Sequence, residues 1–301
     1  MSRYELRELP ALHRDVRRIF ALAPLVMIVL PLAVWLPLDY LAEFLAPEMD
    51  NLRDDMRAYQ RISNALEFFV GTFVFGTTLA AVRRIGANED ASVGACVREA
   101  KEKYGRLLVT VWSAGWRIGL GFLVFIIPGI VLTARYALAL PIVAWSEHKV
   151  CGVDALHESE ELMEGHGRRV LSYGAWGYMM WTCMLMLPHL ALVYLALYGV
   201  EMGMASAWEY PEWLATLLTW PMHLVAVGVT AGTALIYRDI VAQDADASED
   251  AAPVGQAKWS PILEAAPDPE TGKCAVFVVS LLGLIGVAWL IHFAGLLADL
   301  V

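Results

Sequence analysis

Seven apolar stretches, separated by polar connectors or short turns, constrain this chain more than any other feature. A helix rises about 1.5 Å per residue, so about 20 apolar residues cross the roughly 30 Å of hydrocarbon in a bilayer. The stretches approach or exceed that length, and the fourth is the shortest: 19–41, 62–82, 107–127, 130–145, 170–195, 214–237 and 275–297. We therefore expect an all-α, polytopic transmembrane helical bundle of about seven spans.

The overall composition agrees with a membrane location. Hydrophobic residues occupy 58% of the 301 positions, more than the surface of a soluble protein of this size tolerates. Only Pro128 and Gly129 separate the third and fourth stretches, which predicts a tight helical hairpin at the membrane edge. The expected domains are a cytoplasmic segment, a six-span bundle, an acidic flexible linker and a C-terminal transmembrane helix: 1–18, 19–240, 241–273 and 274–301.

The distribution of lysine and arginine predicts the orientation, because basic connectors stay on the cytoplasmic side. With the N-terminus inside, the inner segments hold 17 of the 22 basic residues and the outer loops hold three. The remaining two, Arg117 and Arg135, fall within spans. The chain is thus expected in a bacterial inner membrane, with its N-terminus cytoplasmic and its C-terminus periplasmic.

Two cytoplasmic connectors are expected to form amphipathic helices on the inner membrane surface. In the first, apolar residues recur at helical spacing after Ser92, a candidate N-cap. The second begins near Val153, and its apolar face is formed by Ala155, Leu156, Ser159, Leu162 and Met163. Two interpretations stay open: a duplicated unit of span, surface helix and span, or two unrelated connectors.

Sequence motifs favour a non-enzymatic role without closing the question. There is no Walker loop, dinucleotide fingerprint or Gly-x-Ser-x-Gly elbow, so no catalytic residue and no cofactor is predicted. The net charge of −10 is diffuse, which argues against nucleic acid as a partner. His157, Glu160, Glu161 and Glu164 share a helix face but lack the HExxH arrangement, so we interpret them as a solvated acidic face and predict no metal site.

Several short motifs resemble a known membrane domain. They are Ile127-Pro128-Gly129-Ile130, Gly152-Val153-Asp154-Ala155-Leu156 and Leu235-Ile236-Tyr237-Arg238-Asp239, with Arg135, Ala139, Pro141, Ser159 and Gly165 between them. The pattern, over 62–239, is similar to the domain fused to some glycerophosphoryl diester phosphodiesterases and to related uncharacterised bacterial multi-pass proteins. The resemblance implies a six-span bundle without assigned catalytic residues. Hydrolase activity is not implied, because it belongs to a soluble barrel for which this sequence has no candidate stretch.

Ionisable residues inside predicted spans are the main functional clue, because a charge in hydrocarbon must be paired or hydrated. Arg117 and Arg135 are expected at similar heights on the two arms of the hairpin, and Glu67 is expected level with Arg135. Three interpretations stay open: an Arg135–Glu67 ion pair, a cavity in which both arginines receive an anionic head group such as a lipid phosphate, or snorkelling to the interface.

Two histidines complete the candidate lipid- or anion-binding site. His189 and His223 lie close to Pro188 and Pro221, where a proline interrupts the backbone hydrogen bonds and can open a polar cavity. A hydrogen bond to a neighbouring helix is the favoured interpretation over proton transfer. The candidate set is therefore Arg117, Arg135, Glu67, His189 and His223.

Three function classes follow from these observations. The leading one is a non-enzymatic membrane protein that binds lipid or assists a membrane partner. The alternatives are a lipid or small-molecule transporter and, third, an intramembrane lipid enzyme. Phospholipid is the expected partner in the first class, with a membrane-protein partner or a homo-oligomer left open.

Overall fold

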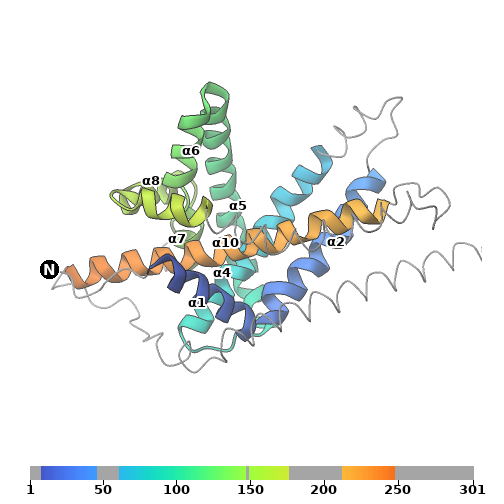
Figure 1. Cartoon of the computed structure of the whole chain (residues 1–301), viewed down its shortest axis with the longest axis horizontal. Helices are drawn as coiled ribbons and strands as arrows, with labels where there is room; N and C mark the ends of the chain where they lie inside the picture. The colour runs from blue at the N-terminus through green and yellow to red at the C-terminus, as the bar shows by residue number, and fades with distance from the viewer. Residues whose placement is uncertain (1–7, 46–60, 147–148, 176–211, 248–301) are drawn as a thin grey trace, which may run out of the picture.

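A computed structural model describes residues 8–45, 61–146, 149–175 and 212–247, which are almost entirely helical and contain no strand (Figure 1). The helices, with two π-helical turns, are α1 Leu9–Leu22, η1 Leu25–Val29, α2 Leu30–Leu45, a helix over 61–66, η2 Glu67–Gly71, α4 Thr72–Gly86, α5 Val93–Val124, α6 Ile126–Arg135, α7 Ala139–Trp145, α8 Val153–Met163, a helix over 167–175 and α10 Glu212–Ala247. The predicted all-α class is confirmed.

Four helical segments in the described ranges are long and apolar enough to cross a membrane: Arg61–Gly86, Val93–Val124, Ile126–Trp145 and His223–Gln243. A bent pair in α1, η1 and α2 raises the number to five if it forms one span. Membrane association is thus supported, whereas the predicted count of about seven is not confirmed. Most of the predicted fifth span and all of the seventh, together with most of the acidic linker, lie outside the described residues.

The predicted first span, 19–41, is wrong at its beginning. Its first residues belong to α1, and the chain bends by 95° between Leu9–Leu22 and Leu25–Trp35. The bend coincides with Ala23, which leaves the helical region just before Pro24, a residue that disfavours helical backbone at the position preceding it. Because Leu12, Val16 and Ile19 repeat at helical spacing, α1 buries one face against the bundle.

The first predicted surface helix and the third predicted span form one uninterrupted helix, α5, of 32 residues. It begins directly after Ser92, as predicted, but the Ser92 hydroxyl donates to Asp90 (2.7 Å) and makes no cap bond to the helix. The hairpin turn lies at Phe125, in extended conformation, and not at Pro128–Gly129. Pro128 instead occupies the first turn of α6, where its missing N–H costs no helical hydrogen bond.

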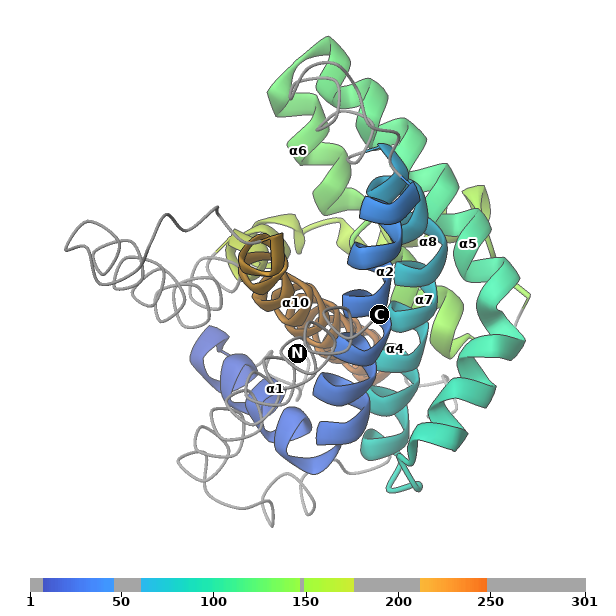
Figure 2. The same ribbon diagram turned by 90° about the vertical axis from the view of Figure 1, so that its right-hand side faces the viewer.

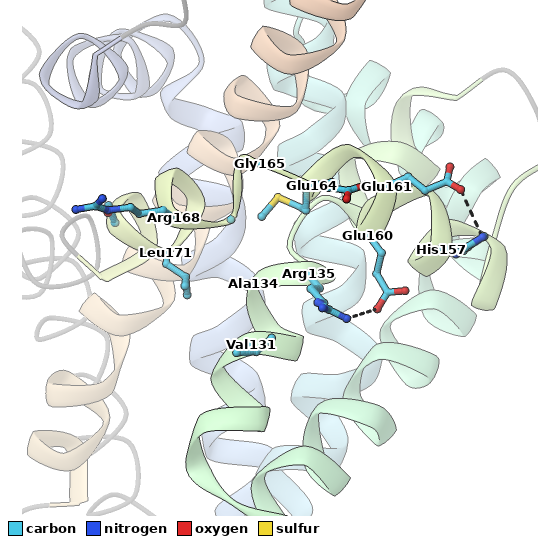
Figure 3. A pocket seen from close by; sticks show the side chains of 13 residues that line it. Val131, Ala134, Arg135, His157, Glu160, Glu161, Glu164, Gly165, Arg168 and Leu171 are labelled. Atoms are coloured by element: carbon cyan, nitrogen blue, oxygen red, sulfur yellow. Dashed lines mark ion pairs between the residues drawn. The ribbon is translucent and has the colours of Figure 1, made fainter.

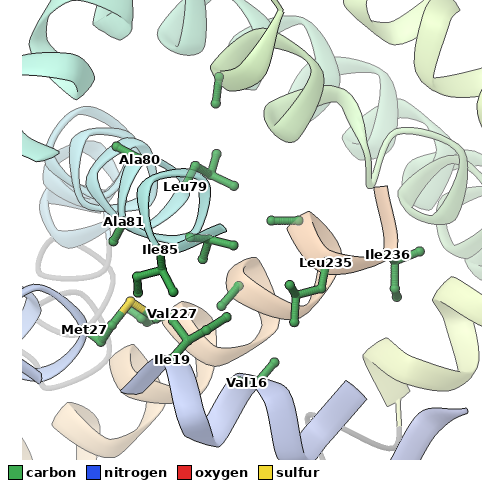
Figure 4. Close-up of a cluster of buried hydrophobic side chains, with 14 of the residues drawn as sticks. Val16, Ile19, Met27, Leu79, Ala80, Ala81, Ile85, Val227, Leu235 and Ile236 are labelled. Atoms are coloured by element: carbon green, nitrogen blue, oxygen red, sulfur yellow. The ribbon is translucent and has the colours of Figure 1, made fainter. Parts of the chain in front are cut away.

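The main core lies where α1, η1, α4, α7 and α10 meet (Figure 4). Small residues let α4 approach its neighbours closely: a Cβ at Gly76 would stand 2.9 Å from Leu107 on α5. Leu79 on α4 and Leu235 on α10 are fully buried in this cluster. Thr77 and Thr78 are also buried there, and each hydroxyl donates to the carbonyl of Val74 (2.8 and 3.0 Å).

The end of α4 is clamped to the beginning of α5 by charge. Arg83 donates to Glu99 (2.7 and 2.8 Å) and Arg84 donates to the same carboxylate (3.1 Å). Glu89, in the connecting turn, accepts two further bonds from Arg83 (3.2 and 2.9 Å), and these hold the pKa of Glu89 below its usual range. This network fixes α4 and α5 as antiparallel neighbours.

The α5–α6 hairpin projects beyond the other described helices, as Figures 1 and 2 both show. Near its tip the arms meet at two glycines: a Cβ at Gly129 would overlap the ring of Phe122, and a Cβ at Gly121 would stand 3.1 Å from the Gly129 backbone. The two arms can therefore pack only because neither position carries a side chain.

Candidate functional site

A cleft of about 740 Å³ lies between α6, α8 and the helix 167–175 (Figure 3). Its walls combine apolar, acidic and basic side chains. The lining residues are Val131, Ala134, Arg135, His157, Glu160, Glu161, Met163, Glu164, Gly165, Gly167, Arg168, Leu171 and Ser172. Such a mixture suits a ligand that has both charged and apolar parts.

The second predicted surface helix, α8, forms one wall, and its predicted apolar face is buried at four of the five positions, Leu162 being only partly buried. Ala155, Leu156, Ser159 and Met163 are buried, while Glu161 on the opposite face is exposed. The pattern that predicted an amphipathic helix therefore identified which side of α8 contacts the protein.

Hydrogen bonds hold α8 against the hairpin. The buried Ser159 hydroxyl donates to the carbonyl of Arg135 (2.6 Å), and the backbone N–H of Gly152 donates to the hydroxyl of Thr110 (2.8 Å). Gly152, the residue before α8, has φ = +58°, and a Cβ there would stand 3.2 Å from Val109. The left-handed backbone and the close approach both favour glycine at this position.

Arg135 carries its charge at the end of α6, on the cleft wall. Its guanidinium lies 3.7 Å from a Glu160 carboxylate oxygen, and its side chain is 58% exposed. Beside it on α8, His157 and Glu161 lie 3.5 Å apart and both are exposed. In Figure 3 the Arg168 side chain extends away from Arg135, so the two cations do not converge on one point.

The predicted site is brought together only in part. Arg135 lines the cleft, but Arg117 and Glu67 do not, and neither does His223. The predicted Arg135–Glu67 ion pair is replaced by the contact with Glu160, because α8 packs directly beside the end of α6. Arg117 does not line this cleft, so the two arginines do not share it.

The two predicted histidines take no part in this cleft among the described residues. His223, on α10, stacks on Trp35 with ring centroids 4.4 Å apart and planes at 9°. His189 lies outside the described residues. His223 therefore contributes to the contact between α2 and α10.

Residues at the start of the helix 167–175 belong to the cleft, and the sequence analysis did not predict them. Arg168, Leu171 and Ser172 were divided between a connector and a predicted span. The available signal was the glycine pair Gly165 and Gly167, since Gly165 has φ = +84° and lies in the turn that follows α8. Arg169, which follows the cleft residue Arg168, contacts the buried Asp239 of α10 (3.3 Å). This contact anchors the helix 167–175 to the core.

No candidate metal site is found in the part of the chain that the structure describes. No group of three or more His, Cys, Asp or Glu side chains in those ranges is placed to hold a metal ion. Comparisons with family models, curated proteins and solved structures found no match. The resemblance to the phosphodiesterase-associated membrane domain stays a prediction.

Proposed function

We propose that this chain is a non-enzymatic membrane protein that holds a phospholipid head group in the cleft between α6, α8 and the helix 167–175. The observation that carries the proposal is the exposed guanidinium of Arg135 at the cleft wall, whose ion pair with Glu160 is long at 3.7 Å. A guanidinium presents a planar fork of N–H donors that matches phosphate oxygens. Arg135 is therefore the proposed phosphate contact.

The charge balance of the cleft favours a zwitterionic head group over a purely anionic one. Three glutamates and two arginines line it, so an added anion without a cation would meet net repulsion. A phosphoethanolamine group supplies both signs: its phosphate suits Arg135, and its ammonium suits the carboxylates of Glu161 and Glu164. The apolar side chains of Val131 and Leu171 lie on the same cleft, where acyl chains would continue.

The finer topology belongs to the same proposal. The excess of basic residues in the predicted inner connectors supports a bacterial inner-membrane location with a cytoplasmic N-terminus and a periplasmic C-terminus. Binding to a membrane-protein partner or a second copy is compatible with this role. Native mass spectrometry of the gently solubilised protein reads out lipids and subunits together.

Arg135→Gln is the direct test of the phosphate contact. Loss of a charge-assisted contact worth about 1.5–3 kcal/mol is expected to reduce retained phosphatidylethanolamine about 10- to 100-fold. The measurement is native mass spectrometry after purification from vesicles of phosphatidylethanolamine and phosphatidylglycerol. Arg98→Gln, an exposed arginine outside the cleft, is the matched control. Equal lipid retention in both variants and the parent protein would refute the head-group site.

The double substitution Glu161→Gln and Glu164→Gln tests the preference for an amine. Since both carboxylates are exposed, we expect a shift of about two- to fivefold in the bound ratio of phosphatidylethanolamine to phosphatidylglycerol, toward phosphatidylglycerol. Glu102→Gln, exposed on α5 and outside the cleft, controls for the overall change in charge. An unchanged ratio would show that the two carboxylates do not select the head group. The role of Arg135 is tested separately by Arg135→Gln.

A further inference from the structure

We infer that the α5–α6 hairpin inserts into the membrane and that its turn at Phe125 lies in the hydrocarbon of one leaflet. Lipid acyl chains then cover its exposed apolar surface. Residues 119–133, here called the distal hairpin, include no ionisable side chain. Leu123, Phe125 and Ile127 are 83%, 73% and 74% exposed. A large apolar surface of this kind marks a contact with membrane or protein.

The position of α8 sets the depth of the hairpin. Gly152 binds Thr110, and Leu156 packs beside Ala114 and Ile118, so α8 crosses the hairpin at the middle of the predicted third span. In Figure 1, α8 lies beside the lower end of α6 and runs across the direction of the hairpin arms. The outer face of α8 carries several exposed ionisable groups, which hydrocarbon would not accommodate without pairing or water. The middle of α5 therefore lies at head-group level, and only the distal hairpin enters the hydrocarbon.

The length of the distal hairpin matches one leaflet. The six residues from Gly119 to Val124 rise about 9 Å, and the eight residues of α6 from Ile126 to Thr133 rise about 12 Å. Half of a roughly 30 Å hydrocarbon layer is about 15 Å. A hairpin that crossed the whole bilayer would instead carry α8 and its charges to the bilayer centre.

Aromatic and basic side chains surround the base of the distal hairpin. Trp112 and Trp116 are each 65% exposed on α5, just before the distal hairpin, and Arg117 and Arg135 flank it on the two arms. Tryptophan is enriched at the membrane interface, and arginine there can reach lipid phosphates. These aromatic and basic residues place the middle of α5 at the membrane interface, in agreement with the position of α8.

The hairpin is also built as a rigid unit. The close approach at Gly121 and Gly129 locks the arms together, and the backbone N–H of Phe125 donates to the carbonyl of Gly121 (3.0 Å). Pro128 contributes no N–H to the first turn of α6, which removes one donor that would need a partner in lipid. Insertion depends on this apolar tip and does not require a head group in the cleft, so its test is separate from that of the proposed function.

A cysteine-accessibility experiment tests the depth. In a full-length background without the four native cysteines, Phe125→Cys is compared with Asp154→Cys, an exposed position on α8, in sealed proteoliposomes of phosphatidylethanolamine and phosphatidylglycerol. We expect a membrane-impermeant maleimide to label position 154 from one face only, and to label position 125 from neither face until the protein is unfolded in sodium dodecyl sulfate. Labelling of position 125 from either face of the intact vesicle would overturn the inference.

A second measurement separates lipid from a covering protein segment and uses the unmodified chain. A phospholipid with a photoreactive diazirine in its acyl chain is expected to crosslink within 119–133, as read by peptide mass spectrometry. The matched internal control is 72–86 in α4, where the side chains are mostly buried and crosslinking should be at least tenfold lower. Absence of crosslinks in 119–133 would show that protein covers the tip and would overturn the inference.

Discussion

Three helical segments that are long and apolar enough to cross a membrane differ in how much of them is buried within the protein. In an apolar stretch of 18 residues, 61% of the positions are buried in His223–Gln243 and 56% in Arg61–Gly86, but only 17% in α5. The first two lose their apolar surface to contacts between α4, α10 and their neighbours. The distal hairpin keeps its surface exposed, so another apolar phase must cover it. Burial therefore distinguishes a helix that builds the core from one that meets lipid.

The largest expected effect concerns the polar anchor of the core. Asp239 is fully buried and contacts Arg169 at 3.3 Å, so Asp239→Ala would leave a largely buried cation without this partner. We expect a loss of about 3–5 kcal/mol in the free energy of unfolding. Denaturant unfolding in detergent micelles measures it, with the exposed Glu102→Ala as control. A loss below 1 kcal/mol would mean that the ion pair does not anchor the helix 167–175.

A matched pair of leucine truncations compares the two regions directly. Leu79 on α4 is 0% exposed and Leu123 in the distal hairpin is 83% exposed. Leu79→Ala is expected to cost about 2–5 kcal/mol through the cavity it leaves, and Leu123→Ala less than about 0.5 kcal/mol. The same micellar unfolding experiment measures both. Equal losses would contradict the distinction between a packed core and an unpacked hairpin.

Sequence periodicity predicted the elements whose burial follows from local pattern. The α8 face is the clearest case, because Leu156, Ser159 and Met163 follow the helical repeat that buries them within the protein. The hairpin itself was also predicted, although its turn lies at Phe125. There the error has a local cause, since a proline that usually ends a helix is equally tolerated in the first turn of the next one.

The site could be predicted only partly, because its contacts join α6, which hydropathy assigns to a span, with α8, which hydropathy assigns to the membrane surface. Arg135 was identified as an intramembrane charge, but its partner was sought on a neighbouring span at the same height. The structure places Glu160 there, since α8 packs across the base of the hairpin, beside the end of α6. The bend at Ala23 was missed for a similar reason, because an apolar run continues through Pro24 without a change in hydropathy.

The smallest expected effect concerns pH and the exposed turn between α4 and α5. The pKa of Glu89 is lowered by its hydrogen bonds to Arg83, so this carboxylate stabilises the fold above the ordinary glutamate pKa of about 4.3. That contribution is lost as the pH falls through the lowered pKa of the folded state. Because Glu89 is exposed, Glu89→Gln is expected to cost less than about 0.5 kcal/mol at pH 7 and a smaller amount at pH 3. Micellar unfolding at the two pH values checks this, and a cost that does not decrease between pH 7 and pH 3 would contradict it.

Spin-label accessibility in bilayers tests most directly whether lipid covers the distal hairpin while α8 faces water. Labels would be attached at Phe125→Cys and Glu161→Cys in the full-length chain, and their collision rates with oxygen and with a water-soluble nickel chelate compared. The label at 125 is expected to collide with oxygen and hardly with nickel, at a depth of about 10–15 Å, and the label at 161 is expected to show the opposite. A label at 125 that is reached by nickel, or by neither reagent, would contradict the account.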